Sequence, residues 1–203
     1  MDKFYFEIPT IERKQDAIEY MAEIFEENST VNGVGGLDKF INDYEGWLKK
    51  LEKDYVAEPS DETVPMRTYF LVRKSDNRIV GMINIRLALN ERLSKYEGNI
   101  GYNIRPSERE KGYNKINLYL GLKVCDKYGL DKILLGVRTN NPASWKTMED
   151  LGGERIREFY NEERKSDVYN YSIDVKESLK TYKKEYEQYI DDDNELIRNI
   201  NEK

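Results

Sequence analysis

Short runs in which apolar residues alternate with polar ones predict a series of β-strands along this chain. Phe4, Phe6 and Ile8 alternate in the first run, which Pro9 ends. Residues 74–78, Lys-Ser-Asp-Asn-Arg, predict a hairpin turn between the next two runs. The later runs predict strands over residues 69–73, 79–87, 99–104, 132–137, 155–160 and 168–173. The pattern therefore indicates about seven strands.

Apolar residues at helical spacing predict helices between these strands. The helix that follows Thr10 is expected to bury Ile18, Met21, Ala22 and Phe25. Further helices are predicted over residues 37–55, about 113–128 and 142–151, the last of them with Asn141 as its N-cap. Residues 90–97 are expected to form a charged loop. Residues 175–203 are expected to form a C-terminal helical extension with one apolar stripe, made of Leu179, Tyr182, Tyr186 and Ile190.

The composition is that of a very soluble globular protein, with 38% hydrophobic and 35% charged residues. No stretch approaches the roughly 20 apolar residues that a membrane-spanning helix needs, so we expect no membrane partner. The first residues lack the pattern of a secretory signal. The single cysteine, Cys125, cannot form an internal disulfide and is expected to be a small core residue. These features predict a cytoplasmic protein.

The chain contains no histidine, which excludes Ser-His and Cys-His catalysis and any histidine-ligated metal. We therefore expect no metal site. The net charge of −6 is unevenly distributed: residues 1–66 carry −9, and residues 67–180 carry +6. The basic middle suits a phosphorylated cofactor, and the acidic first third favours a cationic second substrate. For any individual charge, a solvated helix face is the simpler interpretation. The chain has no basic patch interleaved with aromatic residues, so we expect no nucleic-acid partner.

The most informative local motif is residues 105–114, Arg-Pro-Ser-Glu-Arg-Glu-Lys-Gly-Tyr-Asn. It lies between the predicted strand 99–104 and the predicted helix 113–128. A strand that turns through a glycine into a helix presents unpaired N–H groups at the positive end of the helix dipole, which together bind anions such as pyrophosphate. The alternative is a plain loop in which Ser107 and Glu110 form a capping box.

A second motif follows the strand 132–137: Asn-Pro-Ala-Ser over residues 141–144, with a glycine pair at 152–153. With the motif Arg109-Glu-Lys-Gly-Tyr-Asn114, it resembles the GNAT superfamily of acyl-CoA-dependent N-acetyltransferases. The resemblance covers about residues 67–174. It implies an α/β (α+β) fold: a single domain over residues 1–174 with a mixed central sheet of about seven strands flanked by helices. The helices within about residues 10–56 would lie on the acceptor side.

The resemblance also implies acetyl-CoA as co-substrate and a set of residues that bind it. In this family the backbone of residues 111–114 would bind the pyrophosphate, and a strand edge and the second motif would hold the pantetheine arm. The implied binding residues are Ile104, Arg109, Lys111, Gly112, Tyr113, Asn114, Lys115, Asn141 and Ser144. Two of the loop positions depart from the family pattern. Glu110 places a carboxylate beside the pyrophosphate: pointing inward it would weaken binding by repulsion, and pointing outward or capping with Ser107 it would do little harm. Asn114 replaces a small residue and would crowd the phosphate.

Catalytic residues are harder to assign. The family often uses a strand glutamate as base, and here the nearest is Glu97, at the start of the strand 99–104. The frequent helix tyrosine is replaced by Met148, beside Glu149, which is the second candidate for proton transfer. One of six tyrosines between residues 160 and 189 is a further candidate acid. Alternatively, catalysis rests mainly on holding the amine against the thioester.

These features predict an N-acetyltransferase that moves an acetyl group from acetyl-CoA directly to a primary amine of a small cationic acceptor. The alternative is a non-catalytic acyl-CoA-binding or regulatory protein on the same fold. A third hypothesis is that Glu110 and Asn114 abolish cofactor binding. The C-terminal extension is expected to pack on its own domain, and covering the acceptor cleft or joining two subunits of a homodimer are alternatives.

Overall fold

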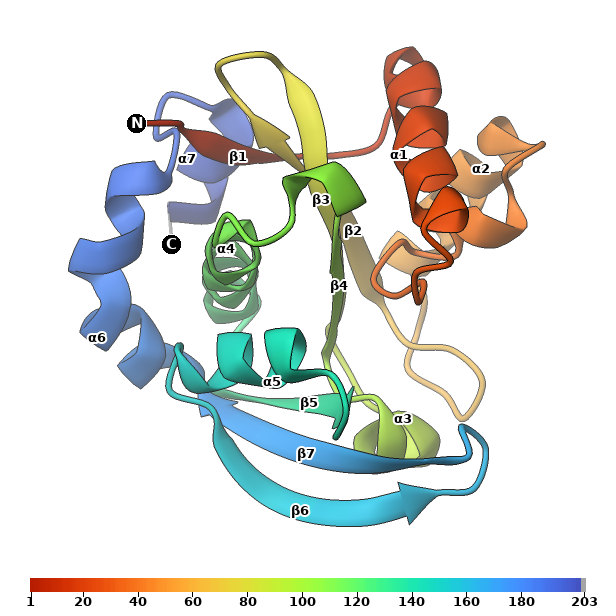
Figure 1. Cartoon of the computed structure of the whole chain (residues 1–203), viewed down its shortest axis with the longest axis vertical. Helices are drawn as coiled ribbons and strands as arrows, with labels where there is room; N and C mark the ends of the chain where they lie inside the picture. The colour runs from red at the N-terminus through yellow and green to blue at the C-terminus, as the bar shows by residue number, and fades with distance from the viewer. Residues whose placement is uncertain (202–203) are drawn as a thin grey trace.

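The structure, a computed structural model, describes residues 1–201 and contains seven strands in two antiparallel sheets (Figure 1). The first sheet has the order β1-β2-β3-β4, and the second has the order β5-β7-β6. The strands are β1 (Phe4–Glu7), β2 (Met66–Arg73), β3 (Arg78–Arg86), β4 (Ile100–Ile104), β5 (Lys132–Arg138), β6 (Glu154–Asn161) and β7 (Ser166–Asp174). The seven strands and the α+β class are confirmed, although the strands form two sheets where the sequence predicts one.

The two sheets meet at one isolated bridge, between Gly98 and Leu135. The backbones are so close there that a Cβ on Gly98 would lie 2.1 Å from the carbonyl oxygen of Leu134. A Cβ on Gly136 would likewise lie 2.3 Å from the carbonyl oxygen of Tyr96. Beyond this junction β4 and β5 share no ladder, so they diverge and leave an open edge on each strand.

Helix α4 (Tyr113–Lys127) lies at the centre of the molecule, between the two sheets (Figure 1). Every residue from 116 to 122 is buried, so this part of the helix is covered on all sides. Cys125 is also fully buried, as the sequence predicts, and burial raises the pKa of its thiol to about 12. The thiol is therefore a core group without nucleophilic character at neutral pH.

Helices α1 (Lys14–Glu26) and α2 (Tyr44–Tyr55) cover the opposite face of the first sheet. The buried face of α1 consists of Ala17, Tyr20, Met21 and Ile24. The predicted inner face is confirmed at Met21 and wrong at Ala22, which is exposed, and at Phe25, which is 45% exposed. The stripe lies one position earlier because it includes the large ring of Tyr20, which packs with Met21 against the sheet.

Two further elements differ from the prediction, and each difference has a capping residue as its cause. The predicted helix over residues 37–55 is a short 3₁₀ turn (Leu37–Lys39) followed by α2, because the side chain of Asp43 accepts a hydrogen bond from the Gly46 N–H and starts a new helix. The predicted loop over residues 90–97 contains α3 (Glu91–Tyr96), since Asn90 caps the N–H of Leu93. Glu97 therefore lies at a helix C-terminus instead of on a strand.

The predicted C-terminal helix is interrupted. Helix α6 (Val175–Tyr186) packs on α4 through the rings of Tyr119 and Tyr186, whose centroids lie 5.3 Å apart. A 3₁₀ turn (Glu187–Tyr189) follows, and Ile190 then bridges Phe4 at the edge of the first sheet. Helix α7 (Glu195–Asn201) ends the described chain. The C-terminal segment thus packs on its own domain, and residues 202–203 of the predicted extension lie outside the described residues.

Candidate cofactor and acceptor cleft

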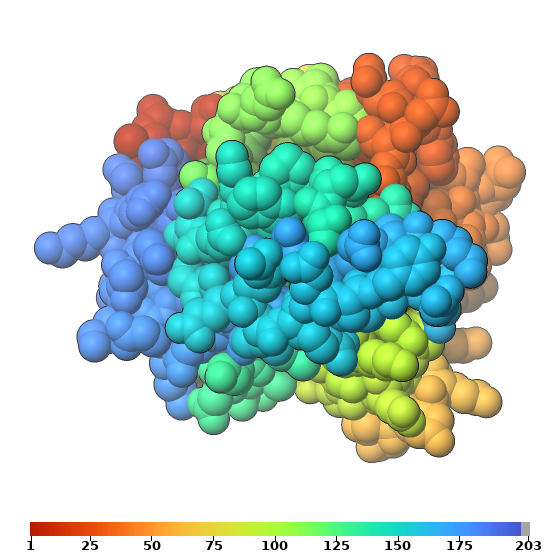
Figure 2. All heavy atoms as spheres, turned by 60° about the horizontal axis from the view of Figure 1, so that its bottom comes forward, coloured from red at the N-terminus to blue at the C-terminus, as the bar shows by residue number. Residues whose placement is uncertain are grey.

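A cleft of about 1000 Å³ opens where β4 and β5 diverge. Its walls are β4, the end of β5 and the first turns of α5 (Pro142–Glu149). Loop 29–33, after α1, and the turn before α4 complete it. Figure 2 shows the β6–β7 hairpin lying across the molecule between α5 and the residues of α3. The cleft joins segments from most of the chain, as ligand-binding sites commonly do, and it is therefore the candidate functional site.

The hydrogen bonds beside β4 fix which of its backbone groups face the cleft. Arg105 donates its N–H to the carbonyl of Val80, and Arg86 donates to the carbonyl of Asn99. In an antiparallel pair such bonds recur at every second residue, so the odd-numbered residues of β4 pair with β3. The backbone groups that point to the open edge are therefore those of Ile100, Tyr102 and Ile104.

The turn before α4 presents an uncapped helix N-terminus to the cleft. Gly112 has a φ of 79° at the N-cap position, and no side chain caps the helix. A Cβ on Gly112 would meet nothing within 4 Å, so a bulky anion has room to approach the backbone. The N–H groups of Tyr113 and Asn114 have no helical acceptors, whereas that of Lys115 donates to the carbonyl of Gly112, and the dipole adds positive potential. This turn has the chemistry of a pyrophosphate site.

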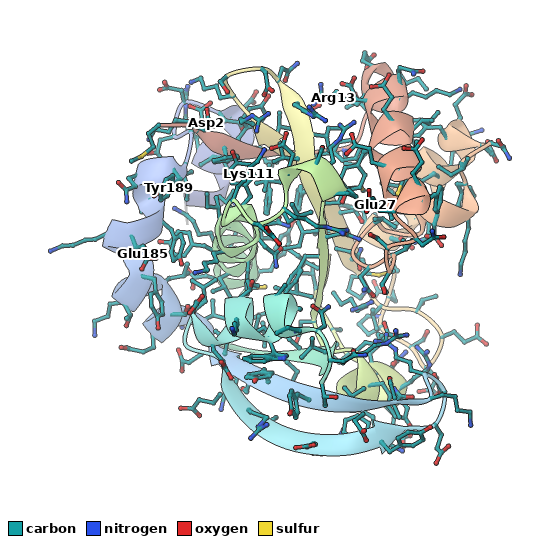
Figure 3. The ribbon with its side chains drawn as sticks, in the orientation of Figure 1. Asp2, Arg13, Glu27, Lys111, Glu185 and Tyr189 are labelled. Atoms are coloured by element: carbon teal, nitrogen blue, oxygen red, sulfur yellow. The ribbon has the colours of Figure 1, made fainter. Side chains whose placement is uncertain are left out.

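The side chains of this turn have different roles from its backbone. Arg109 donates to the carbonyl of Ile104 at 3.2 Å and to the hydroxyl of Ser29 at 2.9 Å, so it ties the turn to loop 29–33. Lys111 lies near the top of α4 (Figure 3), where its Nζ pairs with Glu108 at 2.8 Å. The side chain of Lys111 is therefore committed to a carboxylate, and Lys111 is absent from the cleft lining.

Glu110 lines the cleft in a strained conformation, with a φ of 63°. Left-handed backbone is unfavourable for a residue with a Cβ and is the usual reason for glycine at such a position. The strain and the carboxylate coincide beside Gly112. Both features of Glu110 are therefore unfavourable at a phosphate-binding turn.

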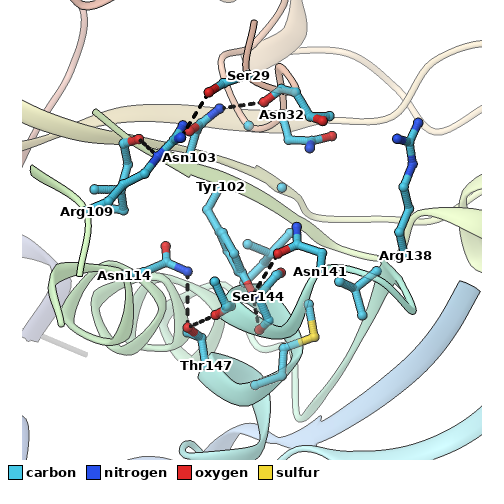
Figure 4. Close-up of a pocket in the computed structure, with 18 of the residues that line it drawn as sticks. Ser29, Asn32, Tyr102, Asn103, Arg109, Asn114, Arg138, Asn141, Ser144 and Thr147 are labelled. Carbon is cyan, nitrogen blue, oxygen red and sulfur yellow. Dashed lines mark hydrogen bonds between the residues drawn. The ribbon is translucent and has the colours of Figure 1, made fainter. Parts of the chain in front are cut away.

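The second motif forms the opposite wall of the cleft (Figure 4). The side chain of Asn141 accepts a hydrogen bond from the N–H of Ser144 and so caps α5. Tyr102 reaches across from β4, and its hydroxyl lies 2.9 Å from the hydroxyl of Ser144. Burial raises the pKa of Tyr102 well above its ordinary value.

Asn114 donates to Thr147 at 3.3 Å, whereas its Oδ1 atom is buried with no hydrogen-bond partner in the described part of the chain. An unsatisfied acceptor in this wall suits a ligand with amide N–H groups, such as pantetheine.

The cleft brings together eight of the nine predicted cofactor residues. They are Ile104, Arg109, Gly112, Tyr113, Asn114, Lys115, Asn141 and Ser144, and Lys111 is the exception. Lys115 lines the cleft with its Nζ 2.7 Å from Asp150, so its charge is partly compensated. This placement is a geometric result, and the binding roles themselves stay predictions.

The two predicted catalytic glutamates lie in different places. Glu149 is exposed on the far side of α5, accepts a hydrogen bond from Tyr171 at 2.7 Å and does not line the cleft. Glu97 does line it, but both of its oxygens are engaged: Oε2 by Arg86 at 2.9 Å, and Oε1 by Arg92 at 3.0 Å and Arg164 at 3.6 Å. Three arginines therefore hold this carboxylate in place.

Sequence reasoning missed four residues of the cleft. Tyr102 lies in the family-like strand, but nothing local indicates that its hydroxyl crosses to α5. Arg86, Arg138 and Arg164 come from three strands or turns that are distant in sequence, and no spacing predicts their meeting. None of the six tyrosines between residues 160 and 189 lines the cleft, so the candidate acids predicted there lie elsewhere.

In residues 1–201, no group of three or more His, Cys, Asp or Glu side chains has the arrangement of a metal site. None of the helices in the same range combines the length and apolar content needed to cross a bilayer.

The comparison with family models gives one match: the acetyltransferase (GNAT) domain, over residues 7–154. Among solved structures, RimJ from Mycobacterium smegmatis in complex with CoA-disulfide is similar, with a TM-score of 0.66, 14% identity and 89% of each chain covered. No curated protein matches the sequence.

Two further solved structures have the same fold. A chimera of the spermidine N-acetyltransferase SpeG from Vibrio cholerae and hSSAT has a TM-score of 0.59 at 14% identity, covering 87% of this chain and 99% of the other. A GNAT-family acetyltransferase from Bacillus anthracis has a TM-score of 0.59 at 16% identity, with coverages of 87% and 99%. At such identities the likeness shows the fold alone.

Proposed function

Because the chain belongs to the GNAT acetyltransferase family, we propose that it is an N-acetyltransferase that moves an acetyl group from acetyl-CoA to a primary amine. The observation that carries the proposal is a single cleft that combines an uncapped helix N-terminus at Gly112, the open edge of β4 and the Asn141 side chain. An elongated molecule with phosphates at one end and amides along its length matches this arrangement: the phosphates would meet the helix N-terminus, and the amides would meet the strand edge and the Asn141 side chain. The family uses acetyl-CoA, and the residues present fit it.

The N–H groups at the start of α4 would bind the pyrophosphate, with Gly112 allowing close approach. The open backbone groups of Tyr102 and the N–H of Ile104 would bond the pantetheine amides, as an added strand would, while the carbonyl of Ile104 is held by Arg109. Asn141 and the unpaired Oδ1 atom of Asn114 would complete this shell from the other wall. The thioester would then lie along β4, on the side of Ile100.

The transfer itself needs few side chains. The neutral amine attacks the thioester carbon, the N–C bond forms, the C–S bond breaks, and the proton lost by nitrogen balances the proton gained by the thiolate. An N–H on the open edge of β4 would polarise the carbonyl oxygen. Tyr102 is the hydroxyl that lines the cleft on β4, and we assign it the proton for the leaving thiolate. Holding the amine against the thioester provides the remaining acceleration.

Glu97 stays a predicted base, but its surroundings favour another role. Its oxygens are held by Arg86, Arg92 and Arg164, so it orders these side chains at the end of the cleft beyond Ile100. The amine would then lose its proton to water in the cleft.

The charge of the acceptor is a separate question. The sequence predicts a cationic acceptor from the acidic residues of the first 66 positions. The residues of that region that line the cleft are Ser29, Thr30, Val31, Asn32 and Gly33, none of which is charged. The cationic acceptor remains a prediction, and a polyamine in the assay tests it.

The decisive experiment measures thiol release from acetyl-CoA by the full chain with polyamines, amino sugars, amino acids and short peptides. We expect turnover with at least one class and a rise in melting temperature with CoA alone. Tight CoA binding with no turnover for any amine would instead support the alternative, a non-catalytic acyl-CoA-binding protein. No melting shift at millimolar acetyl-CoA would mean that Glu110 and Asn114 have abolished binding.

A further inference from the structure

The end of the cleft beyond Ile100 is rich in arginine. Arg86, Arg138 and Arg164 line it, and the carboxylate among them is Glu97. With one acid against three bases, this end has a formal charge of +2. The phosphate-binding turn lies at the other end of β4, after Ile104, so the arginines are separated from it by the length of the strand.

Two of these arginines retain hydrogen-bonding capacity. Arg86 is fixed, because it donates to Glu97 at 2.9 Å and to the carbonyl of Gly98 at 3.0 Å. Arg164, on the β6–β7 turn, makes a single ion pair through its guanidinium, at 3.6 Å to Glu97, and keeps most of its donors unused. The side chain of Arg138 has no hydrogen bond or ion pair in the described part of the chain, although the residue is half-buried.

Arg138 is placed to meet a ligand. It is the last residue of β5, directly before the segment that leads to Asn141. Figure 4 draws its side chain among the residues that line the cleft, and no hydrogen bond connects it to any other residue drawn there. A guanidinium without a protein partner keeps all of its donors for a ligand, so an anion that binds there gains a charge-assisted and often bidentate hydrogen bond.

The anion is not supplied by the cofactor, since the phosphates of CoA would lie at the α4 end. It therefore belongs to the acceptor. A polyamine would instead bring more positive charge to an end that already carries a formal +2, which is unfavourable in a partly desolvated cleft.

We propose that the acceptor is a primary amine that also carries a carboxylate, and that Arg138, with Arg164, binds this carboxylate. The proposal rests on the acetyltransferase function and specifies its substrate class. The carboxylate fixes one end of the acceptor at β5, and the amine at the other end points back along β4 toward the thioester. Arg138 is thus a specificity-determining residue.

The test compares matched acceptors in thiol-release assays with acetyl-CoA. L-Alanine, L-methionine and L-glutamate are each paired with their α-carboxamides, and putrescine represents cationic acceptors. We expect kcat/KM to favour the acid of each pair at least tenfold in the wild type. In Arg138→Gln and Arg164→Gln this ratio should fall toward one, since a charge-assisted bond accounts for roughly tenfold to hundredfold.

Arg155→Gln is the matched control, because Arg155 lies on β6 outside the cleft, and the ratio should stay at its wild-type value. The same pair of acceptors is compared in every variant, so differences in intrinsic amine reactivity cancel. Equal or better use of the amides or of putrescine, or an unchanged ratio in Arg138→Gln, overturns the proposal while acetyl transfer stands. Absence of turnover with every amine overturns the acetyltransferase function, and the substrate class with it.

Discussion

The hydroxyl of Tyr102 on β4 lies 2.9 Å from the hydroxyl of Ser144 in the first turn of α5. This contact spans the two walls of the cleft, β4 and α5. It connects the two sequence motifs physically, because Ser144 belongs to one and Tyr102 to the strand that leads into the other.

If Tyr102 protonates the thiolate, Tyr102→Phe should lower kcat by about 100-fold or more, as general acids contribute 10²–10⁴. The KM for acetyl-CoA should change little, since the ring is retained. Tyr171→Phe is the control, because the hydroxyl of Tyr171 contacts Glu149 outside the cleft. Full activity of Tyr102→Phe would remove the assigned role, and a large loss in Tyr171→Phe would restore Glu149 as a candidate.

Glu110 is expected to weaken both folding and cofactor binding. Glu110→Gly removes the left-handed strain and should raise the free energy of unfolding by about 1 kcal/mol. It also removes a negative charge beside the pyrophosphate, so the Kd for CoA should fall several-fold. Glu110→Gln separates the two effects: it should tighten CoA without stabilising the fold. Calorimetry and urea unfolding measure them, and unchanged CoA affinity in both variants would show that the carboxylate points away from the phosphates.

Glu97→Gln distinguishes a base from an organiser of arginines. If Glu97 only holds the arginines in place, Glu97→Gln should still show the fall in kcat at low pH that the wild type shows. The KM of the acceptor should rise several-fold, because the arginines are less well ordered. Glu163→Gln is a useful comparison, since Glu163 pairs with Arg92 at 2.8 Å but does not line the cleft. Disappearance of the acidic limb in Glu97→Gln would identify it as the base that the sequence predicts.

The junction of the two sheets depends on glycine. In Gly136→Ala the new Cβ would lie 2.3 Å from a backbone oxygen, and the free energy of unfolding should fall by about 1–3 kcal/mol or more. Gly129→Ala, whose Cβ would meet nothing within 4 Å, should cost only the penalty of a left-handed φ, about 1 kcal/mol. Equal losses in the two variants, measured by urea unfolding, would show that the junction tolerates the extra atom.

The ion pair between Glu23 and Arg105 should make stability depend on acid. Burial raises the pKa of Glu23, but hydrogen bonds from Ser107 and Arg105 lower it by more than burial raises it. The net pKa therefore lies below the ordinary 4.5. The folded state therefore binds this proton less readily than the unfolded chain, so the stabilisation is complete above pH 4.5 and is lost as the pH falls through the folded pKa. The difference in unfolding free energy between the wild type and Glu23→Gln should shrink below pH 4.5. A constant difference would contradict this.

The sequence by itself determined the strands, the central helix and the two motifs on which the family resemblance rests. Each of these depends on neighbouring residues: Gly112 makes its own turn, Asn141 caps its own helix, and the alternation of a strand is visible in a few positions. Local errors arose where a cap was overlooked, as at Asp43 and Asn90. The same local reasoning identified the GNAT family, which the match to residues 7–154 confirms.

Only the tertiary structure decided what surrounds the reacting groups. Glu97 is a candidate base in the sequence, but folding brings Arg86 from β3 and Arg164 from the β6–β7 turn onto its carboxylate. Among the described residues, folding also leaves the side chain of Arg138 without a hydrogen-bond or ion-pair partner, and it keeps the acidic residues of the first 66 positions out of the cleft. The electrostatic environment of a side chain depends on distances in space. Around Glu97 it is determined by Arg86 and Arg164, which are 78 positions apart in the chain.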